Sequence, residues 1–239
     1  MWTANSDPKL KDQKAAEMQA SIPTRITPTQ AIRLQQRLAP LVDQTSPLPE
    51  NLAALVGCDA AYLNGTTLAA AVSVRYDNLS VQRIKVIAGR TTFPYVPGLL
   101  AFREGPALLR AIRVLRRSLY VCMVDGHGLS HPRRFGLACF IGLALNQPTI
   151  GVAKSLLCGS VDGNRVLDAS DGSTIAELIT LPGSGKTIYV SVGHKISLND
   201  AVGVVRRCLT PHGPLPIRLA HEEVTRRRWK IKRSNQASS

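Results

Sequence analysis

Acidic residues are scarce in this sequence. Sixteen Asp and Glu stand against thirty Lys and Arg among 239 residues, which gives a formal net charge of +14. A field of this sign attracts polyanions and speeds their encounter with the protein. The alternative is a soluble protein whose positive charge has no binding role. A helix that binds a membrane surface is disfavoured because the basic residues do not gather on one helical face. The charge balance therefore favours nucleic acid as the partner.

Long apolar runs are also missing. No stretch reaches the ~18–20 consecutive apolar residues that a bilayer-spanning helix needs. The polar start of the chain lacks the apolar run of a signal peptide. We therefore expect a soluble, cytoplasmic protein with no membrane partner.

Cysteines are few and show no pairing pattern. None of them forms a C-x-x-C pair, and most lie in apolar runs, where a free thiol packs like a small hydrophobic side chain. The five positions are Cys58, Cys122, Cys139, Cys158 and Cys208. Neither a zinc cluster nor a disulfide framework is expected, which agrees with a reducing compartment.

The hydrophobic pattern predicts one α/β domain with two tails. Hydrophobic residues make up 44% of the chain, enough for a single core of ordinary size. Residues 1–25 are polar and predict a flexible extension, residues 26–230 a single domain, and residues 231–239 a flexible basic and polar tail. A first helix is expected from an N-cap at Thr29 to about Val42.

Three β-type segments follow, at about 53–62, 67–76 and 81–91. Asn64-Gly65 and Asp77-Asn78 lie between them and are typical of hairpin turns. These segments predict an antiparallel three-strand meander.

A different pattern follows the meander. Leu119–Val124 and Thr149–Ala153 predict two buried strands, and a helix of small residues is expected between them at Arg133–Leu145. Strand, helix and strand in this order predict a parallel βαβ unit flanked by helices. Residues 156–192 predict a β-rich insertion, and Leu198–Cys208 a further helix. A meander that leads into parallel strands is the order of an RNase H-like core.

Three carboxylates stand where a solvated surface charge is not expected. Asp59 interrupts the apolar first predicted strand. Asp125 directly follows the buried strand Leu119–Val124, and Glu104 opens an arginine-bearing helix. Ligand-binding groups in parallel sheets gather at the carboxyl ends of strands, and buried carboxylates are costly unless they are paired or bind metal. Their oxygens would suit Mg²⁺. A turn cap at Asp125 and a helix N-terminal charge at Glu104 are the structural alternatives.

Several sequence blocks around these acids resemble the endonuclease V family of repair nucleases, which act at deaminated adenine. The order and spacing of the blocks cover about residues 25–230, and the block P-Y-x-P-G-x-L-x-F-R-E is highly specific. The matching segments are Val56–Asp59, Phe93–Pro106, Val124–Gly128, His131–Gly136, Pro148–Ser155, Val192–His194 and Pro216–His221.

The resemblance implies roles for five catalytic residues. Asp59, Glu104 and Asp125 would be metal ligands, with Mg²⁺ as the cofactor and Mn²⁺ as a substitute. Lys154 would approach the scissile phosphate or the attacking water, and His221 would complete the catalytic edge. An exposed strand-end lysine and a helix-surface histidine are the structural alternatives for these last two residues.

The resemblance also implies a lesion-binding apparatus. Tyr95 would act as a strand-separating wedge, stiffened by Pro94 and Pro97, whose rings fix the backbone on either side. A tyrosine packed on the sheet is the alternative. The pocket for the extruded base would include four residues, and His131 would contact DNA beside it. The four pocket residues are Leu100, Gly126, Gly128 and Gly151.

The implied activity is that of a deoxyribonuclease V. The enzyme would hydrolyse the second phosphodiester bond 3′ to deoxyinosine, leave 3′-hydroxyl and 5′-phosphate ends, and act as a monomer on inosine-containing DNA. Two alternatives stay open: an inosine-specific endoribonuclease, and a non-catalytic nucleic-acid-binding protein.

Two other segments carry weaker signals. Residues 183–187 (G-S-G-K-T) superficially resemble a phosphate-binding loop, but Thr180 stands where that motif requires glycine. The segment also precedes a strand rather than a helix, so we expect a hairpin turn and no ATP binding. Residues 226–233 form a basic cluster that would suit phosphate contacts, and a solvated tail is the alternative.

Overall fold

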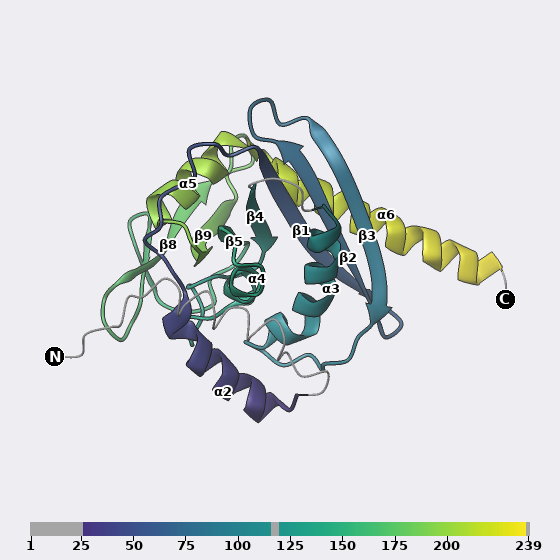
Figure 1. Ribbon diagram of the computed structural model, residues 1–239, viewed down its shortest axis with the longest axis horizontal. Helices are drawn as coiled ribbons and strands as arrows, with labels where there is room; N and C mark the ends of the chain where they lie inside the picture. Colours follow the sequence, from purple (N-terminus) through teal and green to yellow (C-terminus); the bar gives the residue numbers. More distant parts are fainter. Residues whose placement is uncertain (1–25, 116–119, 238–239) are drawn as a thin grey trace.

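A nine-stranded mixed sheet forms the centre of the molecule. The computed structural model describes residues 26–115 and 120–237, so the predicted extension at residues 1–25 lies outside the described residues. The strand order is β3-β2-β1-β4-β5-β9-β8-β7-β6 (Figure 1). Helices cover both faces of this sheet.

The predicted meander is confirmed. β1 (Ala54–Leu63), β2 (Thr66–Arg75) and β3 (Val81–Arg90) pair antiparallel in sequence order. Asn64 and Gly65 both have positive φ, at 47° and 72°, as the tight hairpin between β1 and β2 requires. The local sequence therefore sets the register of this half of the sheet.

The parallel unit is confirmed as well. β1 pairs in parallel with β4 (Tyr120–Asp125), which pairs in parallel with β5 (Thr149–Ala153). The connecting helix α4 (Leu137–Leu145) begins four residues later than predicted, because residues 126–136 form a loop. Together with the meander, this unit gives the expected RNase H-like core.

The region expected to be an insertion continues the main sheet. β9 (Thr187–His194) pairs antiparallel with β5, and three further strands follow it outward. These are β8 (Thr174–Thr180), β7 (Arg165–Leu167) and β6 (Ser160–Asp162). The β8–β9 connection contains the G-S-G-K-T segment and is a hairpin turn, as predicted.

The helices divide between the two faces of the sheet. α3 (Leu100–Leu115) and α4 cover one face, while α5 (Leu198–Arg207) and α6 (Leu215–Ala237) cover the other (Figure 1). α6 lies very close to β1 at Gly57. A Cβ at this position would come within 2.1 Å of the Pro216 backbone. Only glycine fits at this crossing.

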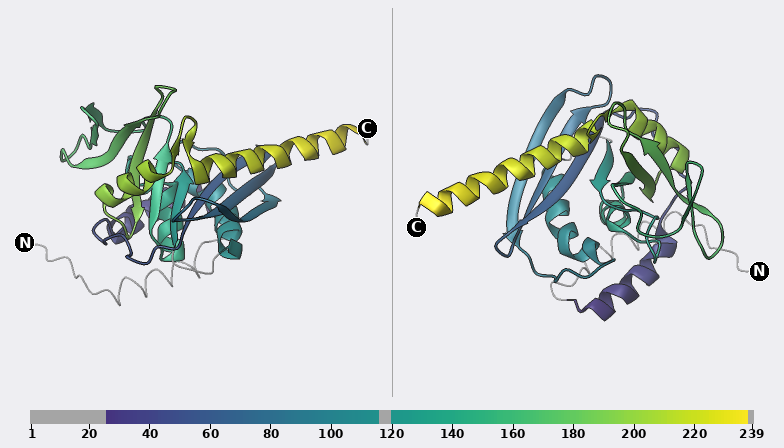
Figure 2. Two further views of the ribbon diagram at one scale, coloured as in Figure 1. Left: turned by 90° about the horizontal axis from the view of Figure 1, so that it is seen from above. Right: turned by 180° about the vertical axis from the view of Figure 1, so that it is seen from behind.

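The last helix, α6, is not among the elements predicted from the sequence. A short hairpin of β10 (Leu209–Thr210) and β11 (Gly213–Pro214) leads into it. Its first half packs on β1 and β2, and its second half projects past the edge of the sheet (Figure 2). The predicted boundary at residue 230 therefore falls inside a helix, and residues 231–237, expected in a flexible tail, have helical backbone.

The first helix begins two residues earlier than predicted. α2 (Pro28–Leu38) has Thr27 rather than Thr29 as its N-cap, because Thr27 and Gln30 cap each other reciprocally. A 3₁₀ turn, η1 (Ala39–Leu41), ends it.

The remaining features of the fold concern the cysteines and the hydropathy of the helices. All five cysteines are free, and four of them are buried. Within the described ranges, no helix combines the length and apolar character needed to cross a membrane.

Candidate active site

Asp59 and Asp125 lie side by side where β1 and β4 cease to pair. Asp59 follows Cys58, the last residue of β1 that pairs with β4, and Asp125 is the last residue of β4. Asp59 shares its side of β1 with Gly57, which faces α6, so both carboxylates open toward that helix. His221 of α6 completes the cluster, with Nδ1 2.8 Å from Asp59 Oδ2. One ligand atom from each of the three residues lies within 4.8 Å of the others.

The surroundings of Asp59 disfavour its ionised form. Burial and the neighbouring Asp125 carboxylate raise the pKa of Asp59, and hydrogen bonds from His221 and the Ala60 backbone only partly oppose them. Two adjacent carboxylates held this way favour a bound cation, whose charge would stabilise both ionised forms.

Lys154 supplies one positive charge at this edge. It follows β5 directly, and its Nζ lies 2.5 Å from Asp125 Oδ2. Burial opposes the charged ammonium, but the Asp125 carboxylate outweighs it, and the pKa of Lys154 is raised. Lys154 therefore stays protonated and is suited to bind an anion rather than to accept a proton.

Glu104 lies apart from the cluster, on the α3 side of the sheet. Its Oε1 accepts a hydrogen bond of 2.8 Å from the Tyr62 hydroxyl. Burial, together with the charges of Asp59 and Asp125, raises the pKa of Glu104 to about 8 against the opposing Tyr62 bond. The structure thus brings together two of the three predicted carboxylates, with His221, and places the third close enough to feel their charge.

The predicted wedge loop exposes its aromatic residue. Tyr95 is 71% exposed, whereas Phe93 and Leu99 on either side of the loop are buried and anchor it. Pro94 and Pro97 are exposed within the loop, as expected of residues that stiffen it. At its end, Gly98 has a φ of +75°, a conformation that favours glycine.

The Gly98 carbonyl oxygen fixes the end of this loop. It accepts hydrogen bonds from Gln35 Nε2 at 3.0 Å, His131 Nε2 at 2.9 Å and Arg133 Nη2 at 2.8 Å. His131 donates through Nε2, and its Nδ1 accepts from the Arg133 backbone amide at 3.2 Å, so the ring is neutral. Burial lowers the pKa of His131 to about 4, in agreement with this tautomer.

A cavity of about 290 Å³ opens beneath the wedge loop. Tyr95, Leu100 and His131 line it, and His127 lies at its wall. This volume is near the lower end of the range found for small-molecule sites, ~300–1,000 Å³.

The three predicted pocket glycines do not line that cavity. A Cβ on Gly128 would come within 2.0 Å of the Val192 carbonyl oxygen, and one on Gly151 within 2.4 Å of the Gly128 amide. Gly126 has a φ of +152° and packs beside Leu137. Close packing of β4, β5 and β9 therefore accounts for Gly128 and Gly151, rather than open space for a base.

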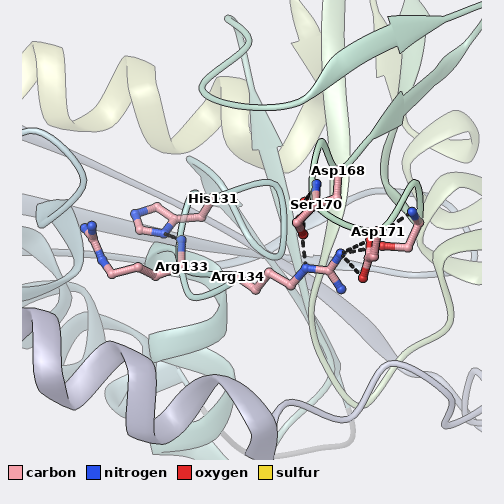
Figure 3. A network of polar contacts seen from close by, with 7 residues as sticks. His131, Arg133, Arg134, Asp168, Ser170 and Asp171 are labelled. Atoms are coloured by element: carbon pink, nitrogen blue, oxygen red, sulfur yellow. Dashed lines mark hydrogen bonds and ion pairs between the residues drawn. The ribbon is translucent and has the colours of Figure 1, made fainter.

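The loop between β4 and α4 is held from two sides. Figure 3 shows Arg133 and Arg134 pointing in opposite directions from this loop. Arg133 reaches Gln35 of α2, with Nε donating to Oε1 at 2.7 Å, whereas Arg134 pairs with Asp168 and Asp171 of the β7–β8 turn, each at 2.9 Å. These contacts compensate for the left-handed backbone of Arg134, whose φ is 48°.

Comparison with known proteins decides the family. Residues 36–222 match the endonuclease V family. The chain is 42% identical over 176 residues to endonuclease V of Desulfurococcus amylolyticus, covering 72% of this chain and 80% of that protein. It is 39% identical over 206 residues to endonuclease V of Thermofilum pendens, covering 84% and 88%. The chain belongs to the endonuclease V family. It is therefore a nuclease.

Solved structures agree with this assignment. Endonuclease V of Streptomyces avermitilis is 31% identical and superposes with a TM-score of 0.77, covering 89% of this chain and 97% of that one. Endonuclease V of Ciona intestinalis, solved with a 24mer DNA containing an inosine followed by a ribo-adenosine, is 25% identical with a TM-score of 0.77. That match covers 83% of this chain and 96% of the other. The RNase H-like fold is thereby confirmed.

Two residues of this endonuclease V site escaped sequence reasoning. Gln35 is fully buried and joins α2 to the wedge loop. Its helical spacing from Ala31 and Leu38 places it on the buried face of α2, and this spacing could have predicted its burial. His127 Nε2 donates to the Ser155 carbonyl at 3.0 Å, and nothing in the sequence indicates that contact.

Proposed function

We propose that this protein is a metal-dependent endonuclease that repairs DNA at deoxyinosine. It hydrolyses the second phosphodiester bond 3′ to the lesion and leaves 3′-hydroxyl and 5′-phosphate ends. The observation that carries the proposal is the cluster of Asp59, Asp125 and His221, which lies where β1 and β4 cease to pair in an endonuclease V fold. The inosine-containing DNA bound by the Ciona intestinalis relative supports the choice of lesion.

The donor set fits a divalent cation. Asp59 and Asp125 offer oxygen ligands that Mg²⁺ or Mn²⁺ accepts, and the raised pKa of Asp59 marks a site where an added positive charge is stabilising. Glu104 would join them while its Tyr62 hydrogen bond holds it in position. A divalent ion held there supplies Lewis-acid stabilisation of the phosphoryl oxygens and lowers the pKa of a bound water.

The chain's own side chains complete the reaction site. The Lys154 ammonium, held at Asp125, would bind a nonbridging oxygen of the scissile phosphate and offset charge that develops there. His221 is fixed through Nδ1 by Asp59, so Nε2 faces the substrate and can hold a proton for the leaving or attacking oxygen.

Tyr95 is proposed as the wedge that opens the strand, with the adjacent cavity receiving the extruded base. An exposed ring on a rigid loop can insert between base steps at a low entropic cost. Tyr95→Ala is expected to weaken binding to an inosine-containing duplex about tenfold, since base–aromatic stacking contributes ~1–3 kcal/mol. Tyr95→Phe keeps the ring and should bind like the wild type, and Mg²⁺ affinity should not change in either variant. Equal inosine affinity in Tyr95→Ala and Tyr95→Phe would contradict the wedge role.

The second half of α6 is proposed to follow the nucleic-acid backbone. Arg228 and Lys232 lie seven and eleven residues after His221 and therefore share its side of the helix. At 1.5 Å per residue they stand roughly 10 and 16 Å further along the axis. Their charges would contact phosphates beyond the reaction site.

The deciding experiment maps cleavage of labelled strands with and without Mg²⁺. Cutting of a deoxyinosine duplex one nucleotide beyond the lesion, lost in Asp59→Ala and Asp125→Ala, is the expected outcome. Binding without cutting would instead establish the non-catalytic alternative.

Inosine-specific cleavage of RNA is the second candidate. It is favoured by one observation: the Ciona intestinalis relative is bound to a strand with a ribo-adenosine after the inosine. Three matched strands separate the candidates: all-DNA, DNA with one ribonucleotide after the inosine, and all-RNA. Faster cutting of the all-RNA strand would replace the DNA assignment.

A further inference from the structure

A second cavity adjoins two of the residues assigned to the reaction, Asp125 and Lys154. It has a volume of about 540 Å³ and is bounded by the β8–β9 turn, the β10–β11 hairpin and the first turn of α6. Asp125 and Lys154 form its inner wall. It shares no lining residue with the cavity beneath Tyr95, which opens beside the N-terminus of α3. The two cavities are therefore separate, and the second is the one lined by Asp125 and Lys154.

The walls of this second cavity suit a nucleic-acid strand. Lys154, Lys186 and His212 are its basic residues, against Asp125 as its one acidic residue. Tyr189 and Pro211 add ring surfaces against which a sugar or base can pack. Apolar side chains complete the lining: Val152, Leu181, Ile188, Pro214 and Ile217. A strand that carries phosphates and packs its sugars or bases on apolar surface fits both kinds of wall.

Lys186 is presented to the cavity by a well-defined turn. The Leu181 amide donates to the Lys186 carbonyl at 2.7 Å, and the Gly185 amide donates to the Leu181 carbonyl at 3.3 Å. Gly183 and Gly185, with φ of +73° and +66°, allow this compact shape. The Lys186 ammonium is exposed and has no ion-pair partner in residues 26–115 and 120–237. It is free to bind an anion.

We propose that this cavity binds the part of the strand that follows the cleaved bond, with Lys186 in contact with one of its phosphates. The inference rests on the proposed function. With the lesion at Tyr95 and the reacting phosphate at Asp125, the strand that continues past Asp125 can enter the cavity that Asp125 and Lys154 share with Lys186. The G-S-G-K-T turn thereby acquires a role in product-strand binding.

Lys186→Gln tests the proposal against a matched control at the other end of the same strand. Lys195 follows β9 at the edge of the sheet remote from Asp125, so Lys195→Gln removes the same charge elsewhere. Each variant is assayed on a deoxyinosine strand with ten nucleotides after the cut and on one with a single nucleotide after it. Lys186→Gln should raise KM on the long strand roughly fivefold, leave kcat unchanged, and reduce the salt dependence of KM by about one phosphate contact. Lys195→Gln should match the wild type.

Truncation of the substrate provides the decisive comparison. On the short strand, Lys186→Gln and wild type should have equal KM, because the contacted phosphate is absent. Lys186→Arg should restore the wild-type KM on the long strand, which a purely structural effect of the glutamine would not allow. Equal KM for Lys186→Gln and wild type on the long strand would overturn the proposal, as would an equal defect on both strands.

A binding measurement separates this inference from the proposed function. A fluorescent 5′-phosphorylated single strand is titrated in chelator, and anisotropy reports its Kd. A Kd weakened only in Lys186→Gln supports the cavity even if the wild type cuts no inosine substrate, an outcome that would defeat the proposed function alone. Equal Kd values in Lys186→Gln and Lys195→Gln would defeat the cavity assignment alone.

Discussion

Replacing Glu104 by glutamine should change how the stability of the metal-free protein depends on pH. The pKa of Glu104 is raised from 4.5 to about 8, chiefly by burial. Between these values the folded protein holds a proton that the unfolded chain has lost, so the free energy of unfolding falls as pH rises. The slope from this one group is about 1.4 kcal/mol per pH unit. Glu104→Gln removes it and keeps an oxygen that can accept from Tyr62.

The clearest pH interval for this measurement lies between 6.5 and 8. Below it, His131 contributes a slope of the opposite sign, because the pKa of His131 is lowered from 6.5 to about 4. Across 1.5 pH units the wild type should lose about 2 kcal/mol more than Glu104→Gln. Urea unfolding in the presence of chelator measures the difference.

A glutamate outside the core provides the control. Glu50 is exposed in the turn before β1, and Glu50→Gln should keep the wild-type slope. Carboxylates bind metal in their ionised form, so Mg²⁺ should favour ionised Glu104 in the folded protein. Adding Mg²⁺ should therefore remove the loss of wild-type stability above pH 7, and it should raise the stability of Glu104→Gln less. Parallel pH profiles for wild type and Glu104→Gln in chelator would refute the reasoning.

Three further outcomes follow from the site. Tyr62→Phe removes the hydrogen bond that positions Glu104 and should weaken Mg²⁺ affinity about tenfold, as measured by the Mg²⁺ concentration for half-maximal cutting. His131→Gln should remove roughly 3 kcal/mol of acid destabilisation between pH 6.5 and 4, because the folded protein resists a proton that the unfolded chain accepts; urea unfolding reports it. The double variant Arg228→Gln/Lys232→Gln should lower the slope of log Kd against log salt for duplex DNA by about 1.8.

Each of these outcomes has a control. Tyr62→Leu also loses the ring that stacks under Arg103, whose Cζ lies 4.2 Å from its centre, and should lose stability as well as Mg²⁺ affinity. A His131→Gln profile parallel to that of the wild type at acid pH would contradict the neutral-ring assignment. Arg227→Gln/Lys230→Gln removes equal charge from other sides of α6, so an equal change in slope would show a general field effect instead of a directed face.

Local sequence determines much of what could be predicted. Asn64-Gly65 specifies its own hairpin, and the parallel pairing of β1 with β4 places Asp59 beside Asp125. Contacts between segments distant in the sequence could not be predicted. The Gln35 side chain meets Phe135 across 100 residues and Gly98 across 63, and no periodicity encodes such a pairing.

Two differences have definite physical causes. Gly128 and Gly151 look like residues that leave space, but their backbones are in close contact, a distinction that composition cannot make. Residues 231–237 look like a tail because they are basic and polar. They are helical because the packed first half of α6 has already met the cost of nucleation, so each further residue adds a hydrogen bond.

The three hydrogen bonds to the Gly98 carbonyl have a consequence for engineering. They join α2, the wedge loop and the β4–α4 loop into one preorganised unit, so the cost of ordering the loop is met on folding rather than on encounter with a lesion. Side-chain identity at position 95 is thereby separated from loop shape, since the Tyr95 ring is exposed and the loop is held by its neighbours. Position 95 is consequently a site where a fluorescent or photo-crosslinking amino acid can report on strand opening without disturbing the scaffold beneath it.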